Sequence, residues 1–205
     1  ELLFRVRNVF GEHCLYLHYR SLGGSVQSTL PEPLDAGGLA ARLKEAVRGG
    51  KQKVGAKFLA VDWAAEVTRG DKARGAKLFA ASGIGCAKCH AARGLAAVPG
   101  APSLVGAGRR FTVPYLVESV LLPNRKVSPV FRSTVIVTNS GKTVTGLVVG
   151  ETGQALTVLT SEAKRVEIPR AEIETRKTQN VSSMPSGLVK TPAELRDLIA
   201  YLLSQ

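Results

Sequence analysis

Two cysteines three positions apart, followed directly by a histidine, constrain this chain more than any other feature. The segment Cys-Ala-Lys-Cys-His occupies residues 86–90. On a tight helical turn, the thiols of Cys86 and Cys89 can both bond to one planar group, and the adjacent imidazole of His90 then points at its centre. The chain has 3 Cys in all. Cys14 is therefore left over, and a disulfide framework is not expected.

This pattern is typical of covalent haem attachment. We expect Cys86 and Cys89 to be joined to vinyl-derived carbons of the porphyrin and His90 to ligate the iron. Two other uses of such a cysteine pair compete with this interpretation. A redox pair needs no following histidine and lies in a βαβ context, which the sequence does not show. A zinc site needs a second pair of ligands, and His13 and His18 lie far upstream on a predicted strand.

The segments on either side of the motif predict a helical core. Asp71 is a plausible N-cap for a helix over 71–81, and Thr191-Pro192-Ala193-Glu194 is a capping box with proline at the first helical position. The second helix is expected to run to about Leu203. Two terminal helices that cross near Gly75, Phe79 and Tyr201 resemble those of class I cytochromes c. The alternative is a pair of ordinary amphipathic helices.

The resemblance to class I cytochromes c implies the second axial ligand. Met184 is the only methionine, and it lies in a Met-Pro loop just before the last helix, where this family has its axial thioether. A thioether opposite imidazole raises the haem potential. Met184 is otherwise a packing residue in a loop. His13 or His18 can substitute only if the N-terminal strands fold over the haem.

The same resemblance suggests roles around the haem for one proline and one arginine. Pro102, in the segment Gly-Ala-Pro-Ser-Leu over 100–104, corresponds to the proline whose carbonyl accepts the other imidazole proton; that bond orients the ring and raises its basicity. The family usually has Gly-Pro where this chain has Ala-Pro. Arg110, or its neighbour Arg109, is a candidate to pair with a haem propionate. The alternative is a solvated surface pair.

Between the middle helix, expected over 113–121, and Met184 lie about fifty residues that minimal class I cytochromes lack. They read as strands over 133–138, 143–150, 155–160 and 165–168, with a short helical turn and a closing strand over 169–176. The spacing suggests a meander or a small SH3-like or Sm-like barrel, an insertion at about 131–178. This combination resembles a haem-binding domain common in planctomycete and verrucomicrobial secreted proteins. The match covers about residues 68–205, and in that family the domain is often the C-terminal module of a larger protein.

The overall prediction is an α+β chain in two parts. Residues 1–67 form an N-terminal extension, with strands over 2–9 and 14–19 and a helix over 39–47, and residues 68–205 form the haem domain. Cys14 is expected to be a small buried hydrophobe; an intermolecular bridge is the alternative. We also expect the chain to be a piece of a longer protein, because its first residues read like the middle of a strand.

The charge distribution bears on partners. Lys and Arg number 28 against 16 Asp and Glu, a net charge of +12. Residues 71–130 hold nine of these basic residues and two of the acidic ones, a net +7 around the cysteine motif. Such a field favours an acidic redox partner, although general solubility explains it equally well. No nucleic-acid motif is present and aromatic residues make up only 5%. No apolar run approaches the ~18 residues needed to span a membrane.

The function that these features predict is electron transfer by one covalently bound haem c, in a protein that is not itself an enzyme. Haem is attached to this motif outside the cytoplasm, so a periplasmic or otherwise exported location is expected. One alternative is a haem-based sensor or enzyme with an open sixth position on the iron. Another is a binding platform built on the β-rich insertion, with the haem in a structural role.

Overall fold

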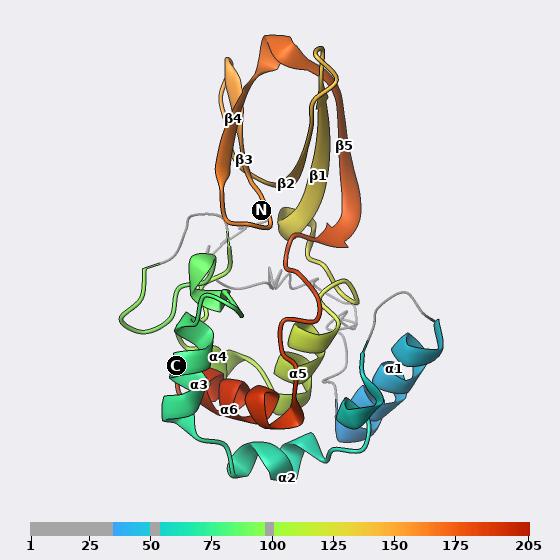
Figure 1. Cartoon of the computed structure of the whole chain (residues 1–205), viewed down its shortest axis with the longest axis vertical. Coiled ribbons are helices and arrows are strands. Elements are labelled where there is room, and N and C mark those ends of the chain that lie inside the picture. Colours follow the sequence, from blue (N-terminus) through green and yellow to red (C-terminus); the bar gives the residue numbers. More distant parts are fainter. Residues whose placement is uncertain (1–34, 50–53, 97–100) are drawn as a thin grey trace, which may run out of the picture.

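The computed structural model describes residues 35–49, 54–96 and 101–205. The predicted strands over 2–9 and 14–19, together with Cys14, His13 and His18, lie outside this part of the chain. The described residues form a group of helices with a β-module above it in the view of Figure 1. The α-helices are α1 (Ala36–Gly49), α2 (Trp63–Thr68), α3 (Lys72–Ala80), α4 (Ala107–Arg110), α5 (Val113–Leu121) and α6 (Pro192–Leu203), joined by short 3₁₀ turns that include η1 (Ala56–Phe58).

The predicted helix ends are formed by side-chain caps. Asp71 accepts hydrogen bonds from the backbone N–H groups of Ala73 and Arg74 at the start of α3. Thr191 and Glu194 form the expected capping box at the start of α6. Both caps satisfy donors that an isolated helix leaves without partners. Because the caps depend on residues two or three positions apart, they could be predicted from the sequence.

Helices α3 and α6 cross at close range, as the sequence predicted. A Cβ atom built on Gly75 would lie 2.0 Å from the carbonyl oxygen of Asp197 and 2.7 Å from Cβ of Tyr201. The rings of Phe79 and Tyr201 pack beside this point, with their centroids 5.4 Å apart. Only a residue without a side chain allows the two backbones to approach this closely.

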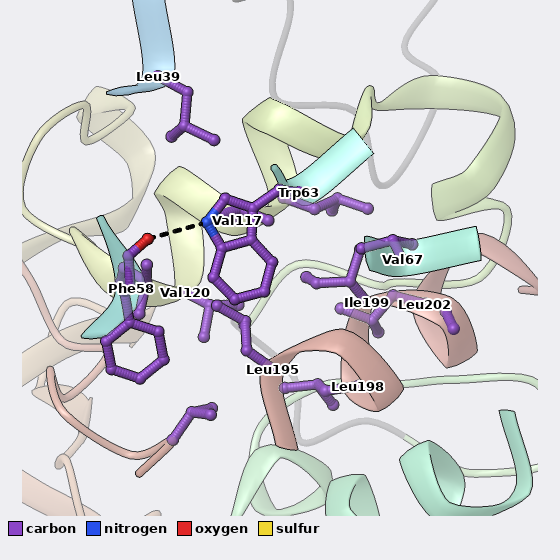
Figure 2. Close-up of a cluster of buried hydrophobic side chains, with 14 of the residues drawn as sticks. Leu39, Phe58, Trp63, Val67, Val117, Val120, Leu195, Leu198, Ile199 and Leu202 are labelled. Carbon is purple, nitrogen blue, oxygen red and sulfur yellow. Dashed lines mark hydrogen bonds between the residues drawn. The ribbon is translucent and has the colours of Figure 1, made fainter. Parts of the chain in front are cut away.

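The helices share one hydrophobic core, shown in part in Figure 2. Trp63 is 4% exposed and its indole N–H donates a 3.2 Å hydrogen bond to the carbonyl oxygen of Phe58. Leu39 of α1, Val117 of α5 and Leu198 of α6 belong to the same cluster. Residues on both sides of the predicted boundary at 67/68 therefore pack together, and the division into domains at this boundary stays a prediction.

The β-module is a five-stranded antiparallel sheet in the order β4-β3-β2-β1-β5. Its strands are β1 (Arg132–Thr138), β2 (Thr143–Glu151), β3 (Ala155–Leu159), β4 (Arg165–Pro169) and β5 (Ile173–Ser182), with the 3₁₀ turn η4 (Arg170–Glu172) between the last two. Strand β2 pairs with β1 up to Gly146 and with β3 from Leu147 onward. A Cβ atom on Gly146 would lie 2.2 Å from the carbonyl oxygen of Leu159, so glycine lets the strand bend there and the sheet curl.

The β-module has its own small hydrophobic core, and its last strand is connected to α6 by a single loop. Its buried residues are Ile136, Val144, Leu156, Val158 and Ile168. Strand β5 ends at Ser182, and the chain then passes through the loop that contains Met184 into α6 (Figure 1). Helices and an antiparallel sheet together make the chain α+β, as expected. No helix in the described residues is long and apolar enough to cross a membrane.

Candidate functional site

A single tight turn brings the two cysteines and the histidine together. Gly85 adopts a left-handed conformation (φ 74°) and leads into the 3₁₀ turn η2 (Cys86–Lys88). The carbonyl oxygen of Cys86 then accepts hydrogen bonds from the backbone N–H groups of Cys89 (3.2 Å) and His90 (2.9 Å). The turn that the spacing predicted is therefore present, with all three side chains half-buried.

The orientation of the His90 ring is set by a backbone carbonyl. Its Nδ1 lies 2.8 Å from the carbonyl oxygen of Pro102. A carbonyl can only accept, so Nδ1 carries the proton and Nε2 of the neutral ring keeps its lone pair. Burial lowers the pKa of His90 below its ordinary value, and the bond to Pro102 opposes this only in part. At neutral pH the ring is thus a neutral imidazole whose Nε2 is suited to bind a metal.

The environment of the two thiols differs from that of a reactive redox pair. Burial raises the pKa of Cys86 to about 11, and burial also raises the pKa of Cys89. Reactive cysteine pairs have a lowered pKa, because the thiolate is the nucleophile. Cys86 and Cys89 form no disulfide with each other, and their raised pKa values disfavour the redox interpretation of this cysteine pair.

A loop after the motif returns Pro102 to His90. The backbone N–H of Leu104 donates a 2.8 Å hydrogen bond to the carbonyl oxygen of Ala91. Arg110, the candidate for a haem propionate, donates from Nη2 to the carbonyl oxygens of Ser103 (2.8 Å) and Val105 (3.0 Å). These hydrogen bonds from the guanidinium stabilise the loop that contains Pro102. Its pairing with a propionate stays a prediction, while Arg109 is exposed.

Met184 is half-buried and packs against the helical core. Its backbone N–H donates to Oγ of Ser182 (3.0 Å), and the N–H of Ser182 donates to Oδ1 of Asn124 (2.7 Å). The loop is therefore fixed at one end to the segment after α5. The structure places Met184 where the module joins the helices, and its role as an iron ligand stays a prediction.

Two polar side chains that sequence reasoning missed hold these loops. Asn124 binds the residue two before Met184, across 58 positions of sequence. Gln205 is 7% exposed and its Oε1 accepts a 2.7 Å hydrogen bond from the N–H of Arg93, across 112 positions. No local pattern marks either residue, because each contact depends on how distant segments meet.

The donor groups of this site fit a haem. Two half-buried thiols lie on one turn beside an imidazole whose Nε2 is unprotonated, and a thioether lies on a separate loop. In addition, Oγ of Ser183, next to Met184, is buried and has no hydrogen-bond partner among the described residues. Within the same part of the chain, no three His, Cys, Asp or Glu side chains gather to hold a metal ion. These donor types, two thiols, an imidazole and a thioether, are the ones that proteins use to attach haem and ligate its iron.

Comparison with known families agrees with this geometry. The family model for cytochrome c matches residues 72–205, which includes the cysteine turn, Pro102 and Met184. No curated protein matches the chain. Because the family model spans more than half of the chain, the protein belongs to the cytochrome c family, whose members bind haem c covalently and transfer electrons.

Proposed function

We propose that this protein is a mono-haem c-type cytochrome that transfers single electrons, with Cys86 and Cys89 as the attachment residues. His90 Nε2 and the sulfur of Met184 are the axial ligands in this proposal. The observation that carries it is the hydrogen bond from His90 Nδ1 to the carbonyl of Pro102, which leaves Nε2 unprotonated and fixes the ring plane.

The bound haem supplies an iron that changes oxidation state by one electron. The protein residues hold and tune it: Pro102 raises the basicity of the imidazole, and the thioether of Met184 favours the reduced state. With His90 and Met184 both bound to the iron, no position would be open for a substrate. This supports electron transfer rather than catalysis.

For the β-module we propose an SH3-like or Sm-like barrel. Three consecutive hairpins lead from β1 to β4, the 3₁₀ turn η4 follows, and β5 crosses back to pair with β1. This order, together with the bend of β2 at Gly146, supports a small curled barrel. The insertion before Met184 is also the feature shared with the haem-binding domain of planctomycete and verrucomicrobial secreted proteins, to which we assign the chain.

The physiological setting that we propose is an exported module of a larger redox protein with an acidic partner. Covalent attachment of haem to a C-x-x-C-H motif takes place outside the cytoplasm, which supports a periplasmic or equivalent compartment. Exposed basic side chains lie close to the motif, among them Lys72, Lys77 and Lys88. Such a surface attracts an acidic donor or acceptor.

The test is the visible spectrum of the ferric and ferrous protein, with and without carbon monoxide, in the wild type and in Met184→Ala. The wild type is expected to be low-spin in both states and not to bind carbon monoxide. Met184→Ala is expected to bind it and to have a lower potential, since the thioether no longer favours ferrous iron. Leu188→Ala, in the same half-buried loop, is the control and should behave as the wild type.

The outcomes separate the two functions under consideration. A high-spin wild type that binds carbon monoxide at once would remove Met184 as a ligand. The protein would then be a haem-based sensor or enzyme with an open sixth position.

A further inference from the structure

Buried polar atoms without hydrogen-bond partners gather where the β-module joins the Met184 loop. In the described part of the chain there are three such atoms, and two of them, Nε of Arg132 and Oγ of Ser183, lie at this junction, while the third, Oγ1 of Thr160, follows β3. Arg132 is the first residue of β1 and pairs with Ser182, the last residue of β5, so the two atoms belong to neighbouring backbone segments. Native proteins leave very few buried polar atoms unsatisfied. This junction therefore calls for a polar group that the described residues do not supply.

The surroundings of Arg132 suit an anion. Arg132 lines an open groove of about 420 Å³ together with Thr134, Glu151, Arg176 and residues 147–150 of β2. Glu151 is already bound by Arg176 (3.0 and 3.1 Å) and by Arg170. Among the described residues, Arg132 itself forms no ion pair. It is thus a cation of the groove that is not engaged in an ion pair with the described residues, whereas the carboxylate of Glu151 is shared by Arg170 and Arg176.

We propose that Arg132 binds a carboxylate of the haem, that is, a propionate group. This inference rests on the proposed function, because Met184, two residues beyond Ser182, is the proposed iron ligand. The planar guanidinium of arginine matches a carboxylate through two parallel hydrogen bonds. The hydroxyl of Ser183, which follows the residue paired with Arg132, is a second buried donor without a partner among the described residues.

The structure favours Arg132 over Arg110 for this role. The Nη2 of Arg110 already donates to two backbone carbonyls, those of Ser103 and Val105. Arg132 has a buried Nε with hydrogen-bonding capacity left. The residue that contacts the haem carboxylate would thus come from the β-module, and the insertion would act directly on the haem rather than as a separate domain.

The electrostatic consequence is specific. A cation beside a propionate favours the ionised carboxylate and so lowers its pKa. The same cation offsets the negative charge near the iron and so favours the ferrous state. Arg132 would therefore raise the reduction potential and keep it independent of pH down to the depressed pKa of the propionate.

The experiment measures the reduction potential of the full-length holoprotein as a function of pH. In Arg132→Gln, we expect a lower potential and a shift of the pH-dependent step to higher pH, with an unchanged low-spin spectrum. Arg176→Gln is the matched control, because it removes the same charge from the same groove. Its pH-dependent step should not move. Arg132→Lys keeps the positive charge but lacks the planar guanidinium. It should shift the pH-dependent step in the same direction as Arg132→Gln, but by less.

Three results would overturn the inference. The first is an equal shift of the step in Arg132→Gln and Arg176→Gln. The second is a pH-dependent step of the reduction potential that stays at the wild-type pH in both Arg132 variants. If Arg132→Gln does not yield holoprotein, Arg132→Lys alone decides this point. The third is saturable binding of acetate by the wild type, abolished in Arg132→Gln while the step stays in place, which would assign the arginine to an external carboxylate. Failure of the proposed function is seen separately, as a wild type without covalent haem on a haem-stained denaturing gel.

Discussion

Asp197 shows how one buried carboxylate can hold two helices together. It is 4% exposed, and it accepts hydrogen bonds from Nε of Arg74 (2.7 Å), Nε of Arg196 (2.9 Å) and the backbone N–H of Asp71 (3.0 Å). Burial alone would raise the pKa of Asp197. The hydrogen bonds from Arg74 and Arg196 outweigh it and hold the pKa well below the usual range.

This arrangement predicts a pH-dependent contribution to stability. The folded-state pKa of Asp197 lies below its ordinary value of 3.8. The contribution is therefore complete above that value and is lost as the pH falls toward the folded-state pKa. We expect Asp197→Asn to lower the free energy of unfolding by about 2 kcal/mol at neutral pH, with a smaller difference in acid. Urea unfolding at neutral and acidic pH measures both, and Glu167→Gln, at an exposed position of β4, should change neither. A deficit of the same size at both pH values would contradict the prediction.

At the residue scale, the sequence predicted the groups proposed to hold the haem but not the side chains that support them. Cys86, Cys89 and His90 stand out because they occur in one short pattern. The hydrogen bond from His90 to Pro102 was expected from the resemblance and is present in the structure. Asp197 gave no signal, because its partners on α3 are 123 and 126 positions away.

At the scale of elements, the crossing of α3 and α6 gives a second test. In Gly75→Ala, the new methyl group would lie 2.0 Å from the carbonyl oxygen of Asp197, so the helices must move apart. We expect a loss of about 1–3 kcal/mol in the free energy of unfolding. Gly153→Ala, where no atom lies within 4 Å of the added Cβ, is the control and should unfold as the wild type. Equal stability of the two variants would show that the crossing tolerates a side chain.

The strands of the β-module were well predicted. The expected segments 133–138, 143–150, 155–160 and 165–168 agree with β1 to β4 to within one residue at each end. Runs of β-branched residues separated by glycine-containing turns make such hairpins readable. Strand β5 is longer than expected and continues to Ser182, because its extension depends on pairing with distant β1 rather than on its own polar side chains.

For the whole molecule, the basic charge around the haem motif leads to a kinetic prediction. Attraction between opposite charges speeds encounter, and salt screens it over about 8–10 Å at 0.10–0.15 M. We expect electron exchange with an acidic partner protein to slow as ionic strength rises, while exchange with a neutral small-molecule reductant does not. Lys88→Gln, at an exposed position within the motif, should weaken the salt dependence more than Lys164→Gln, at an exposed turn of the β-module. Stopped-flow kinetics measure this, and equal effects would argue against docking near the motif.

The sequence by itself determined the features that depend on neighbouring residues. The cysteine and histidine spacing and the caps at Asp71 and Thr191 involve contacts within a few positions, and the hairpins of the module pair consecutive strands. Only the tertiary structure decided which segments meet. It placed Arg132 beside Ser182, Asn124 against the Met184 loop and Gln205 against Arg93. These pairs form because the burial of apolar side chains brings segments together that are far apart in the sequence. The local conformational preferences of the residues do not specify which segments meet.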